Sequence, residues 1–128
     1  MINFSQNATI NLHKIDNAQL NRNAQMLLVE GEQVIGVYKT VRDQVIFTNK
    51  RLIIVDVQGI TGKRQELVTL PYSTIQYFSV QTTGFAELIP DAELSLYFTN
   101  GLQANFEFRG SSDILEIGRM ISRYTLAK

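Results

Sequence analysis

The sequence predicts a mainly-β domain of about seven antiparallel strands, closed by one C-terminal α-helix and preceded by a short N-terminal helix. From residue 33 onward, apolar side chains recur at every second position or in short runs rich in Val, Ile, Thr, Tyr and Phe, which suit a pleated, half-buried surface. Turn-forming residues separate these runs. After residue 109 the apolar residues return to helical spacing, which predicts the closing helix.

The composition fits one globular domain. The 128 residues suffice for one hydrophobic core, with 45% hydrophobic and 19% charged residues. Twelve Lys and Arg balance twelve Asp and Glu, so no positive field favours nucleic acid and repulsion between copies is weak. Because Cys is absent, disulfides, thiolate nucleophiles and Cys-ligated metals are excluded. No signal segment or membrane span is recognised, which predicts a cytoplasmic protein.

The N-terminal part, residues 1–30, is predicted to be a polar segment with one short helix, and residues 31–128 form the domain proper. Four apolar residues fall at helical spacing: Leu20, Ala24, Leu27 and Leu28. Asp16 or Asn17 could cap this helix with a side-chain oxygen. The helix should end near Gly31, because glycine adopts the left-handed conformation that terminates helices.

Seven strands follow, each bounded by turn-forming residues. We expect them at residues 33–39, 43–48, 51–58, 63–70, 75–82, 92–99 and 102–109. The last two should form a tight hairpin, because the pair Asn100-Gly101 supplies the two positive-φ residues of a type I′ turn.

The C-terminal helix has both a start signal and an apolar stripe. Ser111 and Ser112 offer capping hydroxyls, and Asp113 suits the positive end of the helix. The residues of the inward stripe are Ile114, Ile117, Ile121 and Tyr124. Gly118 lies on the same face, where it would allow close approach to the sheet at a cost of about 1 kcal/mol relative to Ala.

Specific segments narrow the fold further. They are Gly31-Glu32, Val41-Arg42-Asp43, Phe47-Thr48-Asn49-Lys50-Arg51, Asp56-Val57-Gln58-Gly59-Ile60-Thr61-Gly62-Lys63, Pro71-Tyr72 and Asp91-Ala92-Glu93-Leu94. Together with the order of elements, they resemble the small stand-alone members of the bacterial pleckstrin-homology-like (PH-like) domain family, from about residue 31 to the C-terminus. The resemblance implies a partly open barrel, no catalytic activity and a tendency to assemble into closed homo-oligomeric rings. No cofactor is expected. The segment 85–90 departs from the family by being longer and more apolar.

No catalytic or metal site is expected. His13 is the only histidine and has no carboxylate or hydroxyl at the spacing of a triad. Two carboxylate pairs, Glu30 with Glu32 and Asp91 with Glu93, would each share one face of a strand. We interpret both pairs as solvated or interface groups, because no sugar-binding aromatic cluster accompanies them.

Basic residues at the strand ends define a candidate anion site. They are Lys39, Arg42, Lys50, Arg51, Lys63 and Arg64. Such a set would suit phosphate oxygens. Asp43 and Asp56 lie among them, and hairpin ends alternate between the two barrel ends, so we do not expect all six to converge. The glycines of the 59–62 turn lack the Gly-Lys-Ser/Thr ending of a phosphate loop and are interpreted as a hairpin turn.

Exposed apolar residues point to a contact surface. Phe85, Leu88 and Ile89 lie in a predicted surface loop, and Ile60 lies at a hairpin tip. The loop either covers an open barrel corner or contacts a partner. We therefore expect a non-enzymatic binding or assembly module, a homo-oligomer that could close into a ring or bind an unknown protein. Binding of an anion or a phospholipid headgroup at a membrane is the alternative, and nucleic acid is not expected.

Overall fold

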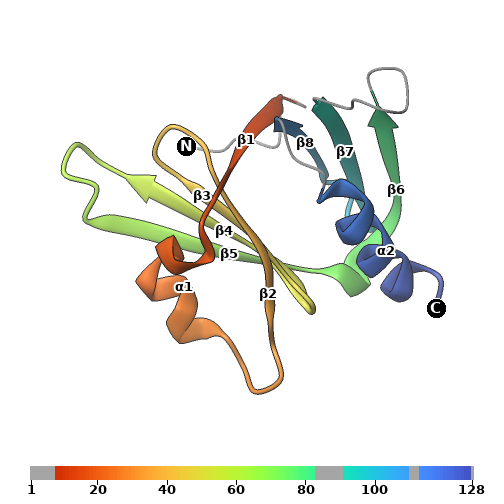
Figure 1. Ribbon diagram of the computed structural model, residues 1–128, viewed down its shortest axis with the longest axis horizontal. Coiled ribbons are helices and arrows are strands. Elements are labelled where there is room, and N and C mark those ends of the chain that lie inside the picture. Colours follow the sequence, from red (N-terminus) through yellow and green to blue (C-terminus); the bar gives the residue numbers. More distant parts are fainter. Residues whose placement is uncertain (1–7, 83–90, 110–112, 128) are drawn as a thin grey trace.

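Eight strands in the described part of the chain form one curled sheet, and two helices lie against it (Figure 1). The structure is a computed structural model that describes residues 8–82, 91–109 and 113–127. The strands are β1 (Thr9–Ile15), β2 (Val34–Lys39), β3 (Gln44–Thr48), β4 (Arg51–Gln58), β5 (Arg64–Pro71), β6 (Ile75–Thr82), β7 (Asp91–Phe98) and β8 (Gln103–Arg109). The helices are α1 (Arg22–Leu27) and α2 (Ile114–Thr125), with 3₁₀ turns η2 (Asn17–Gln19) and η3 (Tyr72–Thr74).

The sheet is a half-barrel that, in the described part of the chain, does not close on itself. Its strand order is β5-β4-β3-β2-β1-β8-β7-β6, so β5 and β6 are the end strands. All neighbouring strands are antiparallel except β1 and β8, which are parallel. The predicted mainly-β, partly open barrel with a C-terminal helix is therefore confirmed, and each of the seven predicted strands lies within one residue of its expected bounds.

The alternating pattern of the sequence places the main core inside the curled sheet. In β7, Ala92, Leu94, Leu96 and Phe98 are buried while the residues between them are half-exposed. They join inward-facing residues of the other strands and one side of α2 in a single cluster. A second, smaller cluster lies on the opposite face of β2, β3 and β4, beneath α1. Because β4 is covered on both faces, its apolar run is continuous rather than alternating.

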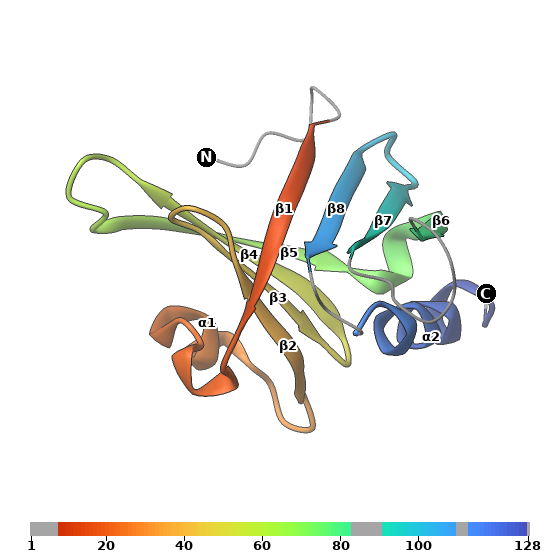
Figure 2. The same ribbon diagram turned by 45° about the horizontal axis from the view of Figure 1, so that its top comes forward.

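Strand β1 was not predicted, and it lies near the middle of the sheet. Figure 2 shows it beside β8, and in register it pairs with β2 on one side and β8 on the other. Its sequence is polar apart from Ile10, Leu12 and Ile15, so the period-two signal is weak. Leu12 is fully buried in the main core. The N-terminal segment therefore supplies a central strand as well as a helix.

The N-terminal helix is shorter than predicted. The expected helix from Asp16 to about Gly31 is replaced by η2 and the six-residue α1. Asp16 caps η2 by accepting a hydrogen bond from the Ala18 N–H, and Asn21 caps α1 by accepting one from the Ala24 N–H. The chain then leaves helical geometry at Leu28, and Gly31 has φ 80° in a turn before β2. Ala24 is the buried residue of this short helix, and it packs against the sheet.

The β7–β8 hairpin is confirmed, but its turn differs from the predicted type I′. The Phe98 N–H donates to the Leu102 carbonyl and the Gly101 N–H donates to the Phe98 carbonyl, which leaves a three-residue loop. Gly101 has φ 90°, as expected for the glycine that ends a three-residue hairpin loop. The glycine is therefore needed, although the loop is one residue longer.

Helix α2 buries the predicted face. Ile114, Ile117 and Ile121 are buried, and Tyr124 is half-buried. Asp113 does not cap the helix through its side chain. Its carboxylate instead accepts a 2.7 Å hydrogen bond from the Tyr38 hydroxyl and pairs with the Lys14 ammonium, which ties the helix start to β2 and to β1. Ser111 and Ser112 lie outside the described residues.

Candidate functional site

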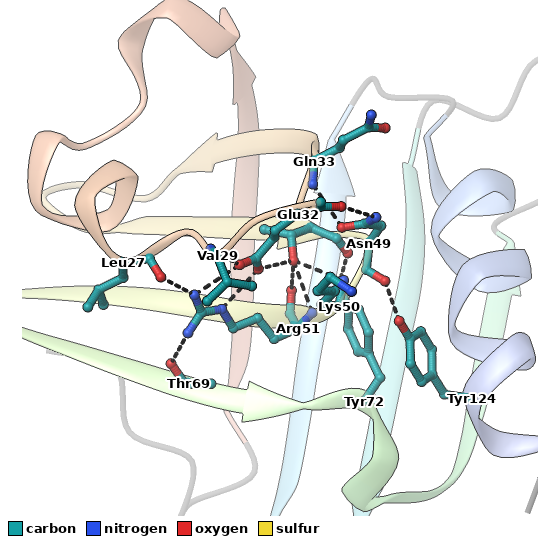
Figure 3. Close-up of polar contacts among 12 residues, drawn as sticks. Leu27, Val29, Glu32, Gln33, Asn49, Lys50, Arg51, Thr69, Tyr72 and Tyr124 are labelled. Atoms are coloured by element: carbon teal, nitrogen blue, oxygen red, sulfur yellow. Dashed lines mark hydrogen bonds and ion pairs between the residues drawn. The ribbon is translucent and has the colours of Figure 1, made fainter.

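A polar cluster at the β3–β4 turn joins segments that are far apart in the sequence (Figure 3). The Arg51 side chain makes two parallel hydrogen bonds to Glu32, from Nε at 2.9 Å and from Nη2 at 3.0 Å. The same guanidinium donates to the Leu27 carbonyl at 2.6 Å and to the Thr69 hydroxyl at 3.2 Å. Arg51 therefore links the end of α1, the start of β2 and β5.

Neighbouring residues of the turn extend this cluster to the helix. The Thr48 hydroxyl donates to Glu32 at 2.6 Å and accepts from the Lys50 and Arg51 N–H groups. Tyr72 donates from its buried hydroxyl to the Thr48 carbonyl, and Tyr124 of α2 donates to the Asn49 carbonyl (Figure 3). Three of the segments that carried the family resemblance, Gly31-Glu32, Phe47-Thr48-Asn49-Lys50-Arg51 and Pro71-Tyr72, thus meet here.

The environment of two groups in the cluster changes their pKa values. Burial alone would raise the pKa of Glu32, but hydrogen bonds from Arg51, from Thr48 and from the Val29 N–H outweigh it and hold that pKa below its usual range. Burial raises the pKa of Tyr72. Glu32 is therefore a charged anchor for Arg51, and Tyr72 is a neutral hydrogen-bond donor.

The six predicted anion-binding residues lie at two opposite ends of the half-barrel. Lys39 and Arg42 belong to the β2–β3 hairpin and Lys63 and Arg64 to the β4–β5 hairpin, and these two hairpin ends are neighbours because Gln44 pairs with Val55. Lys50 and Arg51 lie at the other end, at the β3–β4 turn. The structure thus brings four of the six to one end, and Arg51 uses its donors inside the protein.

The end that carries the four basic residues also has two apolar tips. The Arg42 guanidinium donates to the Gly59 carbonyl and holds the two hairpins together. Val41 and Ile60, one on each hairpin, are 99% and 102% exposed. Gly59 and Gly62 both have positive φ, 77° and 69°, so this loop is the hairpin turn that the sequence predicted. Asp43 and Asp56 are buried at the same end.

The candidate catalytic groups are spread apart. His13 is exposed on β1 between Lys39 and Arg109 in register. Glu30 and Glu32 lie in the turn before β2 rather than on a strand, so the expected shared face is wrong for this pair. Asp91 and Glu93 do share a face of β7, opposite Arg109 and Glu107. Within residues 8–82, 91–109 and 113–127, no three acidic or histidine side chains are arranged to hold a metal ion.

The two edges of the sheet differ in character. In the described part of the chain, β5 and β6 each pair with a neighbour on one side only. Strand β5 carries the charged residues Arg64 and Glu66, whereas β6, with the sequence IQYFSVQT, carries none. On β6, Tyr77 is 56% exposed and Val80 is 38% exposed. Uncharged edge strands of this length are templates for pairing with another chain.

A groove of about 530 Å³ runs along the outer side of α2, and the sequence analysis did not identify it. Its walls come from α2, from β2 and from the β3–β4 turn: Ile35, Asn49, Leu115, Glu116, Arg119, Met120 and Arg123. The signal was present in the sequence, because Leu115, Arg119 and Arg123 recur every four residues on the side of the helix away from Ile117. Only the fold places Ile35 and Asn49 beside them.

Three of the predicted contact residues, Phe85, Leu88 and Ile89, lie outside the described residues. The fourth, Ile60, is the exposed hairpin tip described above. No helix in the described part of the chain combines the length and the apolar character that crossing a membrane requires.

Comparison with known proteins gives one consistent family. The family model described as Bacterial PH domain matches residues 3–125. The chain is 38% identical over 114 residues to the uncharacterized protein YjqA of Bacillus subtilis (strain 168), a match that covers 88% of this chain and 90% of YjqA.

Two solved structures have the same fold. A protein with a pleckstrin-homology domain from Shewanella loihica PV-4 superimposes with a TM-score of 0.70 at 31% identity, covering 91% of this chain and 98% of that one. A pleckstrin homology domain from Shewanella amazonensis SB2B gives a TM-score of 0.56 at 35% identity, covering 87% and 89%.

Proposed function

The chain belongs to the bacterial PH domain family, and from this premise we propose that it is a non-enzymatic module that assembles with further copies of itself. The non-enzymatic part of the proposal is supported by the family and by the scattered positions of His13 and the carboxylate pairs. A general base has to lie within hydrogen-bond reach of the group whose proton it removes. The separate positions of His13 and the carboxylate pairs do not favour such an arrangement.

One observation carries the assembly proposal, namely that β6 is uncharged and pairs with a neighbouring strand on one side only in the described part of the chain. Natural edge strands are usually protected by Lys, Pro, a bulge or a covering element. Strand β6 has a register irregularity at its start, between Ile75 and Tyr77, and α2 packs near Phe78 and Val80. Its eight residues nevertheless include neither charge nor Pro, and Tyr77 and Val80 are exposed. The zero net charge of the chain adds little repulsion between copies. Pairing of this edge with a second copy would satisfy its backbone groups and bury its apolar side chains.

The closed ring is the part of the proposal that rests on the family resemblance. In a ring, β6 of one copy meets a surface other than β6 of the next. A contact between two different surfaces repeats from copy to copy, and it gives a closed ring when the rotation closes and a filament when it does not.

Lysines placed on the edge test the proposal. Ser79→Lys together with Gln81→Lys puts two charges on exposed positions of β6, where they oppose strand pairing. We expect sedimentation velocity to show a lower mass for this variant than for the wild type. Gln25→Lys with Met26→Lys, at exposed positions of α1, adds the same charge and should sediment like the wild type. An oligomer that keeps its mass with both edge lysines would contradict β6 as the contact.

A second candidate function is binding of an anionic surface such as phospholipid headgroups. It is favoured by the gathering of four basic residues beside the exposed Val41 and Ile60 at one end of the half-barrel. Apolar tips flanked by Lys and Arg suit a membrane interface, where each basic residue near an anionic surface contributes about 1 kcal/mol. The nearby carboxylates of Asp43, Asp56 and Glu66 weaken this field.

Liposome sedimentation separates this candidate from self-assembly. The candidate predicts binding to anionic vesicles that weakens from low to physiological salt and is reduced in Lys39→Ala/Lys63→Ala. The matched control is Lys50→Ala, an exposed lysine at the opposite end of the half-barrel. Equal loss in the control, or no binding by the wild type at low salt, would reject an anion-binding end.

A further inference from the structure

Two buried carboxylates lie next to each other at the end of the half-barrel that carries the β2–β3 and β4–β5 turns. Asp43 and Asp56 are 4% and 5% exposed. Gln44 pairs with Val55 in register, and the two aspartates are the next residues of their segments toward this end. Asp43 Oδ1 accepts a 2.8 Å hydrogen bond from the Val57 N–H, which places its carboxylate against the peptide group that follows Asp56.

Asp56 has an oxygen that lacks a partner in the described part of the chain. Within residues 8–82, 91–109 and 113–127, its Oδ1 is buried and receives no hydrogen bond, and its carboxylate forms no ion pair. The guanidinium of Arg42 donates instead to the Gly59 carbonyl. Glu32, whose side chain is also fully buried, has Arg51 as its partner. Because burial of an unpaired carboxylate is strongly unfavourable, Oδ1 of Asp56 requires a donor or a cation that the described residues do not supply.

The groups around this oxygen favour a hard metal cation. They are carboxylates: Asp43 lies beside Asp56, and Glu66 lies opposite it in register. Ca²⁺ and Mg²⁺ take oxygen ligands, and Mg²⁺ is commonly held by one or two carboxylates while it keeps several waters. We propose that Asp43 and Asp56 bind a divalent cation, Mg²⁺ or Ca²⁺, with Oδ1 of Asp56 as a ligand.

A pocket at the same end gives a hydrated ion room to approach. It has a volume of about 300 Å³, and its lining includes Thr40, Arg42, Asp43 and Gln44. Because one water occupies about 30 Å³ in the liquid, the pocket has room for several waters beside Asp43. A bound cation would offset the carboxylates that weaken the positive field of this end. The inference is independent of the proposed assembly, and the sequence analysis did not foresee it because the burial of the two aspartates becomes evident only in the fold.

Thermal unfolding with and without divalent cations tests the site. Wild-type protein freed of metal with EDTA and then dialysed should melt several degrees higher in millimolar MgCl₂ or CaCl₂ than in NaCl of equal ionic strength, because an ion that binds only the folded state stabilises it. Asp56→Asn keeps the size of the side chain but removes its charge, and it should abolish this increase. The matched control is Glu93→Gln, at a half-exposed carboxylate of β7 that lies opposite Glu107, and it should keep the increase. Isothermal titration calorimetry should give one ion per chain for the wild type and for the control.

Without divalent cations, the same variant distinguishes a metal ligand from a structural hydrogen-bond acceptor. Metal-free Asp56→Asn should melt at or above the temperature of the metal-free wild type, because it removes a buried charge and breaks no hydrogen bond to Oδ1. A lower melting temperature would mean that the protein already supplies a partner, and it would overturn the inference. The inference is also overturned by a wild type that responds to neither salt, as expected for an ordered water alone, by an increase that Asp56→Asn retains, or by one that Glu93→Gln loses equally. None of these outcomes depends on the mass of an oligomer, so the proposed assembly is tested separately.

Discussion

Three polar side chains of the Phe-Thr-Asn-Lys-Arg segment, those of Thr48, Asn49 and Arg51, bind other parts of the protein. Arg51 has carboxylate, carbonyl and hydroxyl partners, and the Thr48 hydroxyl binds Glu32 and two backbone N–H groups. Asn49 fixes the start of β2 by accepting from the Gln33 N–H and donating to the Gly31 carbonyl. These contacts explain how a short polar segment can mark a family through the fold it stabilises rather than through a ligand.

The Glu32–Arg51 pair should stabilise the fold in a pH-dependent way. We expect Glu32→Gln to lower the free energy of unfolding at pH 7 by about 1.5–3 kcal/mol, the usual contribution of hydrogen bonds to a charged group. Urea unfolding measures this value. Gln33→Ala, at an exposed side chain beside Glu32, should change it by less than about 0.5 kcal/mol.

The sign of the pH effect follows from the lowered pKa of Glu32. A carboxyl whose pKa is lower in the folded state stabilises the fold fully above its ordinary value, which is 4.5. The stabilisation is lost as the pH falls below that value and through the folded pKa. The wild type should therefore lose more stability than Glu32→Gln between pH 7 and pH values below 4.5. Equal losses would contradict this role of Glu32.

Two glycines should respond in opposite ways to alanine. A Cβ at Gly118 would lie 3.8 Å from Val80 and 3.9 Å from Phe78, which is ordinary contact, so the expected close approach does not require glycine there. Gly118→Ala should raise stability by about 0.5–1 kcal/mol through helix propensity. Gly101→Ala should lower it by about 1–2 kcal/mol, because Gly101 has φ 90°. Thermal melts of both variants check this, and a lower melting temperature for Gly118→Ala would refute it.

Among the elements, the strands in which apolar residues recur at regular spacing could be predicted, and the polar strand β1 could not. The seven predicted strands and α2 show in their local sequence which side chains are buried. In β1 the inward-facing residues include Lys14, whose ammonium meets Asp113, so the alternation of apolar residues is broken by a long-range ion pair. Local pattern cannot reveal a pairing with β8, which lies three quarters of the chain length away in sequence.

The positions of the candidate site residues could be predicted only where they depend on hairpins between consecutive strands. The alternation of hairpin ends predicted that the six basic residues would not all converge, and in the structure Lys50 and Arg51 lie at the opposite end from the other four. The partners of Arg51 could not be foreseen, because Leu27, Glu32 and Thr69 come together only in three dimensions. The groove along α2 was missed for the same reason, since Ile35 and Asn49 reach it from other elements.

Strand β1 should be essential although its sequence is polar. Leu12→Ala removes a fully buried side chain from the main core and should cost about 2–5 kcal/mol of stability. His13→Ala, on the exposed face of the same strand, should cost less than about 0.5 kcal/mol. Chemical denaturation measures both. Similar effects of the two changes would mean that β1 does not pair as described.

The whole molecule is a half-barrel whose faces are better covered than its edges. Helix α2 covers the inner face and α1 part of the outer face of β2, β3 and β4. Strands β5 and β6 end the sheet without a second neighbour among the described residues. A zero net charge does not oppose pairing of an edge with another copy. These features are the ones on which the proposal of assembly rests.

The mass of the wild-type protein in solution tests this account most directly. Light scattering coupled to size exclusion, over a range of protein concentrations and at low and physiological salt, gives that mass independently of shape. The account predicts a single species at a multiple of 14.5 kDa, the mass of one chain, that persists on dilution. A species of 14.5 kDa at every concentration and salt would contradict it.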